Sequence, residues 1–164
     1  MKQFYLMIES FSFIAKTFPD WTLEIYGDGD EKNTLLELIK KLDLVNNVII
    51  HPPTALVYEE LYNSAFCALA SDKESFGMVY IESFSMEKPV VSYDIDYGPK
   101  AFLRNEHNSL ISPCFDKEHF ARQMKRLIED ETLRNSLGRN ARKTFIEKYE
   151  ISKVMESLIK EINP

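Results

Sequence analysis

The sequence predicts an α/β protein of the Rossmann-like, doubly wound type, with a parallel sheet covered by helices on both faces. Helical and strand patterns alternate along most of the 164 residues. Several strand segments, such as VII, FCALA and PVV, are continuous apolar runs, which is typical of strands that are buried on both faces. The length suits one domain, residues 1–164, with a hydrophobic core of its own.

The first part of the chain shows the alternation most clearly. Apolar residues recur every three or four positions over residues 2–17, which predicts an amphipathic helix that Pro19 ends. The strand formers of residues 21–26 then stop at a Gly-Asp-Gly turn. Further on we expect helices over residues 31–42, 56–64 and 77–86, and strands over residues 47–51, 66–70 and 89–93.

The last part of the chain is mainly helical. We expect a short strand over residues 109–111, followed by helices over residues 116–129, 132–149 and 151–161. The Lys and Arg residues between Arg122 and Lys148 stand among acids at helical spacing. We interpret them as a solvated helix face, with contact to a membrane surface as the alternative.

Composition narrows the classes of function. The net charge of -6 disfavours nucleic acid as a partner, since that partner requires a basic surface. Cys67 and Cys114 match neither a disulfide framework nor metal-site spacing, so we expect no metal. With no export signal and no apolar stretch of transmembrane length, we expect a cytoplasmic protein, with a peripheral position at the inner face of the membrane as the alternative.

The loop before the helix at residues 77–86 is the best candidate for a site. Ligands of open parallel sheets bind at the carboxyl ends of the strands. This loop holds Glu74, and Gly77 follows where the helix begins, with unpaired N–H groups that suit a phosphate oxygen. Glu82, in the second turn, can direct a carboxylate to the same ligand. Alternatively, Glu74 only caps the helix and Glu82 is a surface residue.

The motifs of this region resemble a known family. Glu74-x-Phe76-Gly77, then Glu82, KPVVS and YGP, resemble the E-x7-E signature region of the retaining glycosyltransferases with the GT-B fold, of the family 4 or group 1 type. The segment WTLEIYGDGDEKNTLLELIKKLDLVNNVIIHP is similar to the family's strand, GDG turn, helix and strand. The resemblance covers nearly the whole chain, as its C-terminal, donor-binding domain, and is most specific over residues 71–99.

The resemblance implies a role for each matching residue. Glu74 would hold hydroxyls of the donor sugar, and Glu82 would hold the ribose hydroxyls. Lys2 matches a diphosphate-contacting lysine that would also stabilise the leaving group; a flexible terminal lysine is the alternative. The resemblance implies further donor-binding positions. The sugar and diphosphate would meet Ser75, Phe76, Gly77, Met78 and Val79. Gly27 would lie at the edge of the cleft, and the base would lie near Pro52 and Thr54. His51 we interpret as structural.

The resemblance also implies the chemistry. Backbone amides and basic residues neutralise the diphosphate in this family, so no cofactor or metal is expected. Retention is ascribed to a front-face displacement in which the leaving phosphate helps to deprotonate the acceptor. The implied donor is a nucleoside diphosphate sugar, UDP-linked. The implied acceptor is a polysaccharide, capsular or teichoic-type polymer, an expectation that rests on what the family usually does.

The sequence departs from the family pattern at several places. Glu87, Glu106 and Ser109 replace glycines, and Ala101 stands where an acid is common. A non-glycine residue with positive φ costs roughly 1 kcal/mol. The family's first strand, which ends in G-R-L and is central in the sheet, and its acceptor-binding N-terminal domain both precede the matched region, so we expect a fragment with exposed strand edges.

These departures leave alternatives open. The chain alone should bind nucleotide weakly and transfer little, and it should be marginally stable or self-associate. A non-catalytic module that complements a separate N-terminal half is the second hypothesis. A sugar-nucleotide epimerase of similar architecture is the third, but only His51 and His107 offer the acid/base groups that it would need.

Overall fold

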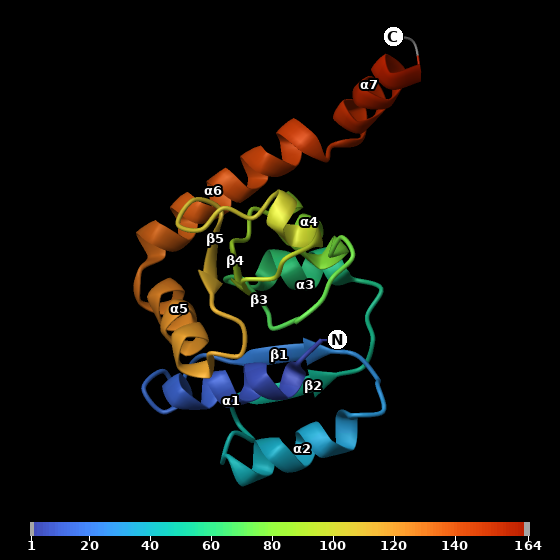
Figure 1. Ribbon diagram of the computed structural model, residues 1–164. Coiled ribbons are helices and arrows are strands. Elements are labelled where there is room, and N and C mark those ends of the chain that lie inside the picture. Colours follow the sequence, from blue (N-terminus) through green and yellow to red (C-terminus); the bar gives the residue numbers. More distant parts are fainter. Residues whose placement is uncertain (1, 163–164) are drawn as a thin grey trace.

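Every helix and strand expected from the sequence is present in the computed structural model, which describes residues 2–162 (Figure 1). A short 3-10 helix, η1 (Gly98–Ala101), was not expected; Pro99 stands in its first turn. The helices are α1 (Phe4–Ala15), α2 (Lys32–Lys41), α3 (Val57–Asn63), α4 (Met78–Ser85), α5 (Lys117–Glu129), α6 (Glu131–Lys148) and α7 (Ile151–Ile162). The strands are β1 (Leu23–Tyr26), β2 (Val48–His51), β3 (Cys67–Leu69), β4 (Val90–Tyr93) and β5 (Ser109–Ser112).

The strands are all parallel to their neighbours, as expected, but they form two separate sheets. β1 pairs with β2, and β4 lies between β3 and β5. Over residues 2–162 no strand joins β1 to β3. β4 is buried at every position, whereas β3, which has a hydrogen-bonded neighbour on one side alone, is only half-buried.

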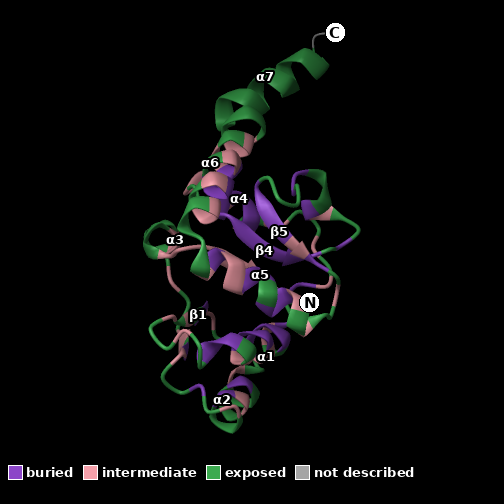
Figure 2. Ribbon diagram, turned by 90° about the vertical axis from the view of Figure 1, so that its left-hand side faces the viewer, coloured by how far each residue is buried: buried purple, intermediate pink, exposed green. Residues whose placement is uncertain are grey.

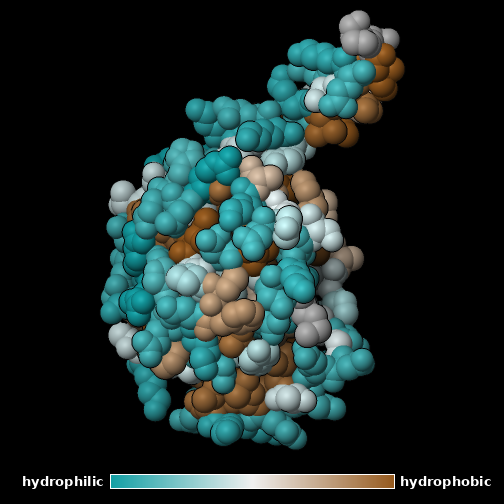
Figure 3. Space-filling model, viewed as in Figure 1, coloured by the Kyte–Doolittle hydropathy of each residue, from teal (hydrophilic) through white to brown (hydrophobic). Residues whose placement is uncertain are grey.

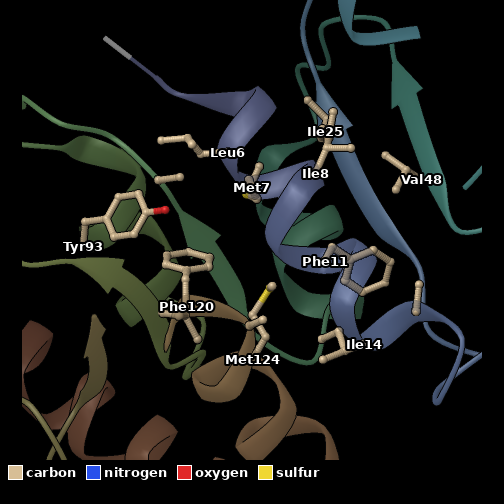
Figure 4. Close-up of a cluster of buried hydrophobic side chains, with 14 of the residues drawn as sticks. Leu6, Met7, Ile8, Phe11, Ile14, Ile25, Val48, Tyr93, Phe120 and Met124 are labelled. Carbon is tan, nitrogen blue, oxygen red and sulfur yellow. The ribbon is translucent and has the colours of Figure 1, made fainter. Parts of the chain in front are cut away.

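The main core joins the two sheets through helices. Ile8 of α1 lies close to Ile25 of β1, with Phe11 in the same cluster, and Phe120 of α5 packs against Tyr93 of β4, with ring centroids 4.9 Å apart (Figure 4). Each fully buried side chain of this kind stabilises the fold by about 2 kcal/mol. Contact between α1 and α5 therefore holds the β1–β2 sheet to the β3–β4–β5 sheet.

A second core lies between α4 and α6. It contains Tyr80 and Phe84 of α4, Phe102 from the loop after η1, and Ala141 of α6. Gly138 of α6 lies against the Glu87 carbonyl, where an added Cβ would collide with the backbone. The close approach of α6 to the end of α4 therefore requires this glycine.

The basic residues of α5 and α6 are only partly a solvated face. Lys125 and Lys143 make exposed i,i+4 pairs with acids of their own helices. Three arginines instead anchor the helices, because Arg126 pairs with Glu106, Arg134 donates to the Leu127 carbonyl and Arg142 donates to the Ser85 carbonyl. The solvated face thus also carries arginines that join elements, and Arg126 keeps 41% of its side chain exposed.

α7 projects from the body and buries none of its residues (Figures 1 and 2). Apolar side chains gather along one side of it (Figure 3). Its exposed apolar residues are Ile151, Val154, Met155, Leu158, Ile159 and Ile162. Among the described residues, no helix is both long enough and apolar enough to span a bilayer.

Candidate functional site

The loop between β3 and α4 brings Lys2, Ser71 and Glu74 together. Ser71 pairs with Lys2 in an isolated antiparallel bridge, so the backbone before α1 lies beside the start of the loop. The Ser71 hydroxyl donates to Glu74 Oε1 at 2.8 Å, which orients the carboxylate. Ser71 was missed from the sequence, although the S-x-x-E spacing was available.

α4 begins at Gly77 without a side-chain cap. Gly77 adopts the left-handed conformation with φ 81°, and no side chain bonds the first amides of the helix. A Cβ at this position would lie 2.6 Å from Tyr80 Cδ2, so glycine is required. The alternative in which Glu74 caps α4 is wrong, because its hydrogen bond is to Ser71 instead. The uncapped amides, with the helix dipole behind them, are suited to an anion.

The flanking residues of this helix start face outward. Ser75 is exposed, and Phe76 and Met78 expose 42% and 59% of their surface, so a ligand can reach the backbone between them. Val79 is half-buried.

Glu82 is available to a ligand. It is half-buried in the second turn of α4, and no hydrogen bond or ion pair joins its side chain to another described residue. Burial raises the pKa of the Cys67 thiol to about 12, and the charges of Lys2 and Glu82 act on that thiol in opposite directions. Lys2 and Glu82 therefore lie within electrostatic reach of the same strand.

The YGP segment, residues 97–99, packs against the loop that holds Glu74. Gly98 has φ 67°, and a Cβ there would lie 2.5 Å from the Glu74 carbonyl oxygen and 2.9 Å from that of Ser75. α4 itself is tied to β4 by a 3.0 Å hydrogen bond between the Tyr80 and Ser92 hydroxyls. The two loops thus pack backbone to backbone, which fixes where Glu74 lies. Sequence reasoning did not find this role of Gly98.

The candidates Gly27, Pro52 and Thr54 lie on the other sheet, at the ends of β1 and β2. The Gly27 amide donates to the His51 carbonyl at 3.1 Å, and Thr54 Oγ1 accepts from the Leu56 amide at 2.9 Å. Both groups are therefore engaged by the fold, and Pro52 is exposed. The prediction that His51 is structural agrees with its ring stacking on Tyr26 at 4.7 Å.

A cluster around Tyr26 was not foreseen. Its hydroxyl lies 2.9 Å from a Glu24 carboxylate oxygen and 2.8 Å from one of Glu60. Burial and these two carboxylates raise the pKa of Tyr26. The phenol therefore stays protonated and links β1 to α3.

A cavity of about 320 Å³ lies next to the YGP segment. Lys100 and Arg104 supply positive charge to its lining, and Asp94 supplies negative charge. Glu74 and Glu82 are not among the residues that line it. Over residues 2–162, no group of three or more His, Cys, Asp or Glu side chains is placed to hold a metal ion.

The family of the chain follows from comparison with known proteins. Residues 1–144 match the model of the family described as glycosyl transferases group 1. The chain belongs to this family. The match includes β3, the Glu74 loop and α4.

Curated relatives align with most of this chain. An exopolysaccharide phosphotransferase of Streptomyces coelicolor is 35% identical over 141 residues, which are 85% of this chain and 15% of the relative. A poly(ribitol-phosphate) alpha-N-acetylglucosaminyltransferase of Staphylococcus aureus is 26% identical over 162 residues, which are 99% of this chain and 33% of the relative. The chain therefore spans a third or less of these two proteins.

Solved structures confirm the fold. The crystal structure of a TarM mutant of S. aureus, in complex with fondaparinux, alpha-GlcNAc-glycerol and UDP, has a TM-score of 0.91 and 26% identity, and covers 99% of this chain and 33% of that one. The C-terminal domain of a group 1 glycosyl transferase from Francisella tularensis has a TM-score of 0.83 and 22% identity, covering 92% of this chain and 80% of that one. The expected resemblance to a C-terminal GT-B domain is confirmed.

Proposed function

We propose that this chain is the donor-binding domain of a retaining hexosyltransferase that takes a nucleoside diphosphate sugar, UDP-linked, as its substrate. The observation that carries the proposal is the uncapped start of α4, with the Glu74 carboxylate just before it and the Glu82 carboxylate in its second turn. One loop and one helix thereby present an anion site between two acceptors of hydroxyl hydrogen bonds.

Each group has a distinct role in this proposal. The amides at Gly77 and Met78, together with Lys2, whose backbone pairs with Ser71 at the start of the loop, bind the diphosphate and stabilise it as it leaves. Glu82 accepts hydrogen bonds from the ribose hydroxyls. Glu74, oriented by Ser71, accepts hydrogen bonds from the donor sugar. Neutralisation by amides and a lysine means that donor binding requires no metal.

The relatives favour the same substrates. TarM was crystallised with UDP, and two relatives are named as transferases of poly(ribitol-phosphate) and poly(glycerol-phosphate). We therefore propose a polysaccharide, capsular or teichoic-type polymer as the acceptor. An N-terminal domain outside the region described here would bind this acceptor, so that the chain alone transfers little. The reaction would take place in the cytoplasm, at the inner face of the membrane.

Calorimetric titration with UDP tests the proposal. Glu82→Ala should weaken binding by about tenfold to a hundredfold, since a hydrogen bond to a charged group contributes about 1.5–3 kcal/mol. Glu37→Ala is the control, because Glu37 is an exposed glutamate in the middle of α2, and it should change the affinity by less than about twofold. Equal affinities of the two variants would show that Glu82 is not the ribose acceptor.

The interrupted sheet favours a second function, that of a non-catalytic module that completes a separate polypeptide. The facing edges of β1 and β3 are unpaired with each other over residues 2–162, and such edges invite a strand from another chain. A chain that binds neither UDP nor UDP-sugars, yet forms a stable complex with a separately produced GT-B N-terminal domain, would support this function over the first.

A further inference from the structure

An aromatic cluster connects the loop between β3 and α4, which holds Glu74, to the C-terminal end of α6. Phe102 lies at its centre, with ring centroids 5.8 Å from Phe76, 6.1 Å from Tyr80 and 5.5 Å from Tyr149. Tyr149 also contacts Phe76 directly, at 5.8 Å and an edge-on angle of 70°. Tyr149 ends α6, and α7 begins two residues later.

Phe76 is held by this cluster and little else. Its ring is 42% exposed, and its ring contacts are those with Phe102 and Tyr149. The backbone on its N-terminal side is fixed separately, by the Ser71–Glu74 hydrogen bond and by Gly98. The conformation of the loop between Glu74 and Gly77 therefore depends on where the Tyr149 ring lies.

Tyr149 is itself fixed at the end of its helix. Its amide donates to the Phe145 carbonyl at 2.8 Å, and the Glu150 amide donates to the same oxygen at 3.0 Å. Burial raises the pKa of the Tyr149 phenol, as expected for a ring that lies partly inside the protein.

We propose that Tyr149 is a positioning residue, which through Phe76 sets the sugar side of the donor site. The inference rests on the proposed function. Tyr149 does not reach the nucleotide side, because α4 and Glu82 are anchored by the Tyr80–Ser92 hydrogen bond and by the buried side chains of α4. Loss of the Tyr149 ring thus affects the sugar contribution to binding, through the Phe76 backbone, more than the UDP contribution, because only the Gly77 end of the diphosphate site lies next to Phe76.

Three variants separate positioning from general support. Tyr149→Ala removes the ring, and Tyr149→Phe keeps it. Phe145→Ala is the control, because Phe145 packs against the same buried cluster while its recorded ring contact is with the Arg142 guanidinium and not with Phe76. The Tm of each variant shows how far it is destabilised.

Titrations with UDP, UDP-glucose and UDP-N-acetylglucosamine provide the first readout. Tyr149→Ala should weaken the tighter-binding UDP-sugar by about tenfold and UDP by clearly less, about threefold at most. Tyr149→Phe and Phe145→Ala should keep the wild-type ratio of the Kd for UDP to the Kd for the tighter-binding UDP-sugar. An equal loss for UDP and UDP-sugar in Tyr149→Ala, or the same change of ratio in Phe145→Ala, would overturn the proposal.

Amide hydrogen exchange of the free protein provides a second readout that does not depend on a donor. Tyr149→Ala should speed exchange in residues 74–77 at least about fivefold, whereas Phe145→Ala at similar Tm should not. Unchanged exchange in Tyr149→Ala overturns the inference. Absence of UDP binding by the wild-type protein, with faster loop exchange in Tyr149→Ala, refutes the proposed function and leaves the positioning role of Tyr149 intact.

Discussion

Two glutamates occupy left-handed backbone positions. Only one of them makes a side-chain interaction that offsets the steric cost of its positive φ. Glu87 and Glu106 both have φ 60°, which confirms the expectation of strain where they replace the family's glycines. The Glu106 carboxylate binds the Arg126 guanidinium with both oxygens, one of them at 2.9 Å. The Glu87 side chain is exposed and has no such partner among the described residues.

Replacing Glu87 by glycine should therefore stabilise the fold. The expected gain for Glu87→Gly is about 1 kcal/mol, since glycine adopts positive φ without a steric cost. Glu106→Gly should gain less, or lose stability, because it also removes the pair with Arg126. Urea unfolding of both variants measures this difference, and a lower midpoint for Glu87→Gly would contradict the prediction.

The Glu106–Arg126 pair should also make stability depend on pH. The hydrogen bond from Arg126 lowers the pKa of Glu106 in the folded protein. A lowered folded-state pKa gives stabilisation that is present above the unfolded-state value of about 4.3 and is lost as the pH falls through the folded-state value. The Tm advantage of the wild-type protein over Glu106→Gln should thus be largest near pH 7 and shrink below about pH 4. Glu37→Gln, at an exposed position, should show no such trend.

Other site details could not be predicted at the scale of single residues. The S-x-x-E spacing of Ser71 and Glu74 also fits a helix cap, and only the structure shows that the hydroxyl holds the carboxylate. Ser109 lies buried in β5, so its replacement of a glycine does not put a side chain at positive φ. Ala101, which stands where an acid is common, lies exposed in η1. Conformation at these positions depends on neighbours that are distant in sequence.

At the scale of elements, the two stacked loops should respond together to a change at Gly98. Gly98→Ala places a methyl group 2.5 Å from the Glu74 carbonyl oxygen, and the loop must shift to make room. We expect a loss of about 1–2 kcal/mol in stability and weaker binding of UDP-sugars. Gly29→Ala is the matched control, because nothing lies within 4 Å of its added Cβ. Normal donor affinity in Gly98→Ala would show that this loop does not support the site.

The last helix should be dispensable for stability. α7 was predicted, but the sequence could not show that none of its residues is buried. A chain that ends at Glu150 should keep its Tm within about 2 °C, since no buried apolar area is lost. It keeps Tyr149 and so keeps the aromatic cluster. A fall of more than about 5 °C in a thermal melt would show that α7 packs on the body in solution.

At the scale of the whole molecule, the hydrophobic pattern of the sequence and the resemblance to the group 1 family each predicted a different part of the fold. Continuous apolar runs predicted the parallel strands, because strands buried on both faces have no polar side. The interrupted sheet was expected from the resemblance alone, since strand order is not encoded in spacing. The bridge made by α1 and α5 across the two sheets (Figure 4) was not predicted, because it depends on packing between helices far apart in the sequence.

The interruption of the sheet should be visible in solution as unprotected amides. In a parallel strand, alternate residues bond to opposite neighbours. Leu23 donates toward β2 and Cys67 toward β4, so the amides of Glu24, Tyr26 and Ala68 face the interruption. In a hydrogen-exchange experiment, the amides of Glu24, Tyr26 and Ala68 should exchange well before the amides of Leu23 and Ile25, which bond to β2. Equal protection on both sides of β1 would mean that the edge is covered.

The same edges should make the free chain associate. Unpaired N–H and C=O groups on β1 and β3 can pair with those of a second copy, and the net charge of -6 opposes association only weakly at physiological salt. Sedimentation over a hundredfold range of concentration should show a rising average mass, reduced in a variant that carries Glu24→Pro, because proline removes an edge donor. That variant must first be shown to melt cooperatively. A wild-type chain that remains monomeric at every concentration, with one sharp unfolding transition, would contradict the prediction, and would show that α1 and α5 stabilise the two sheets without an added strand.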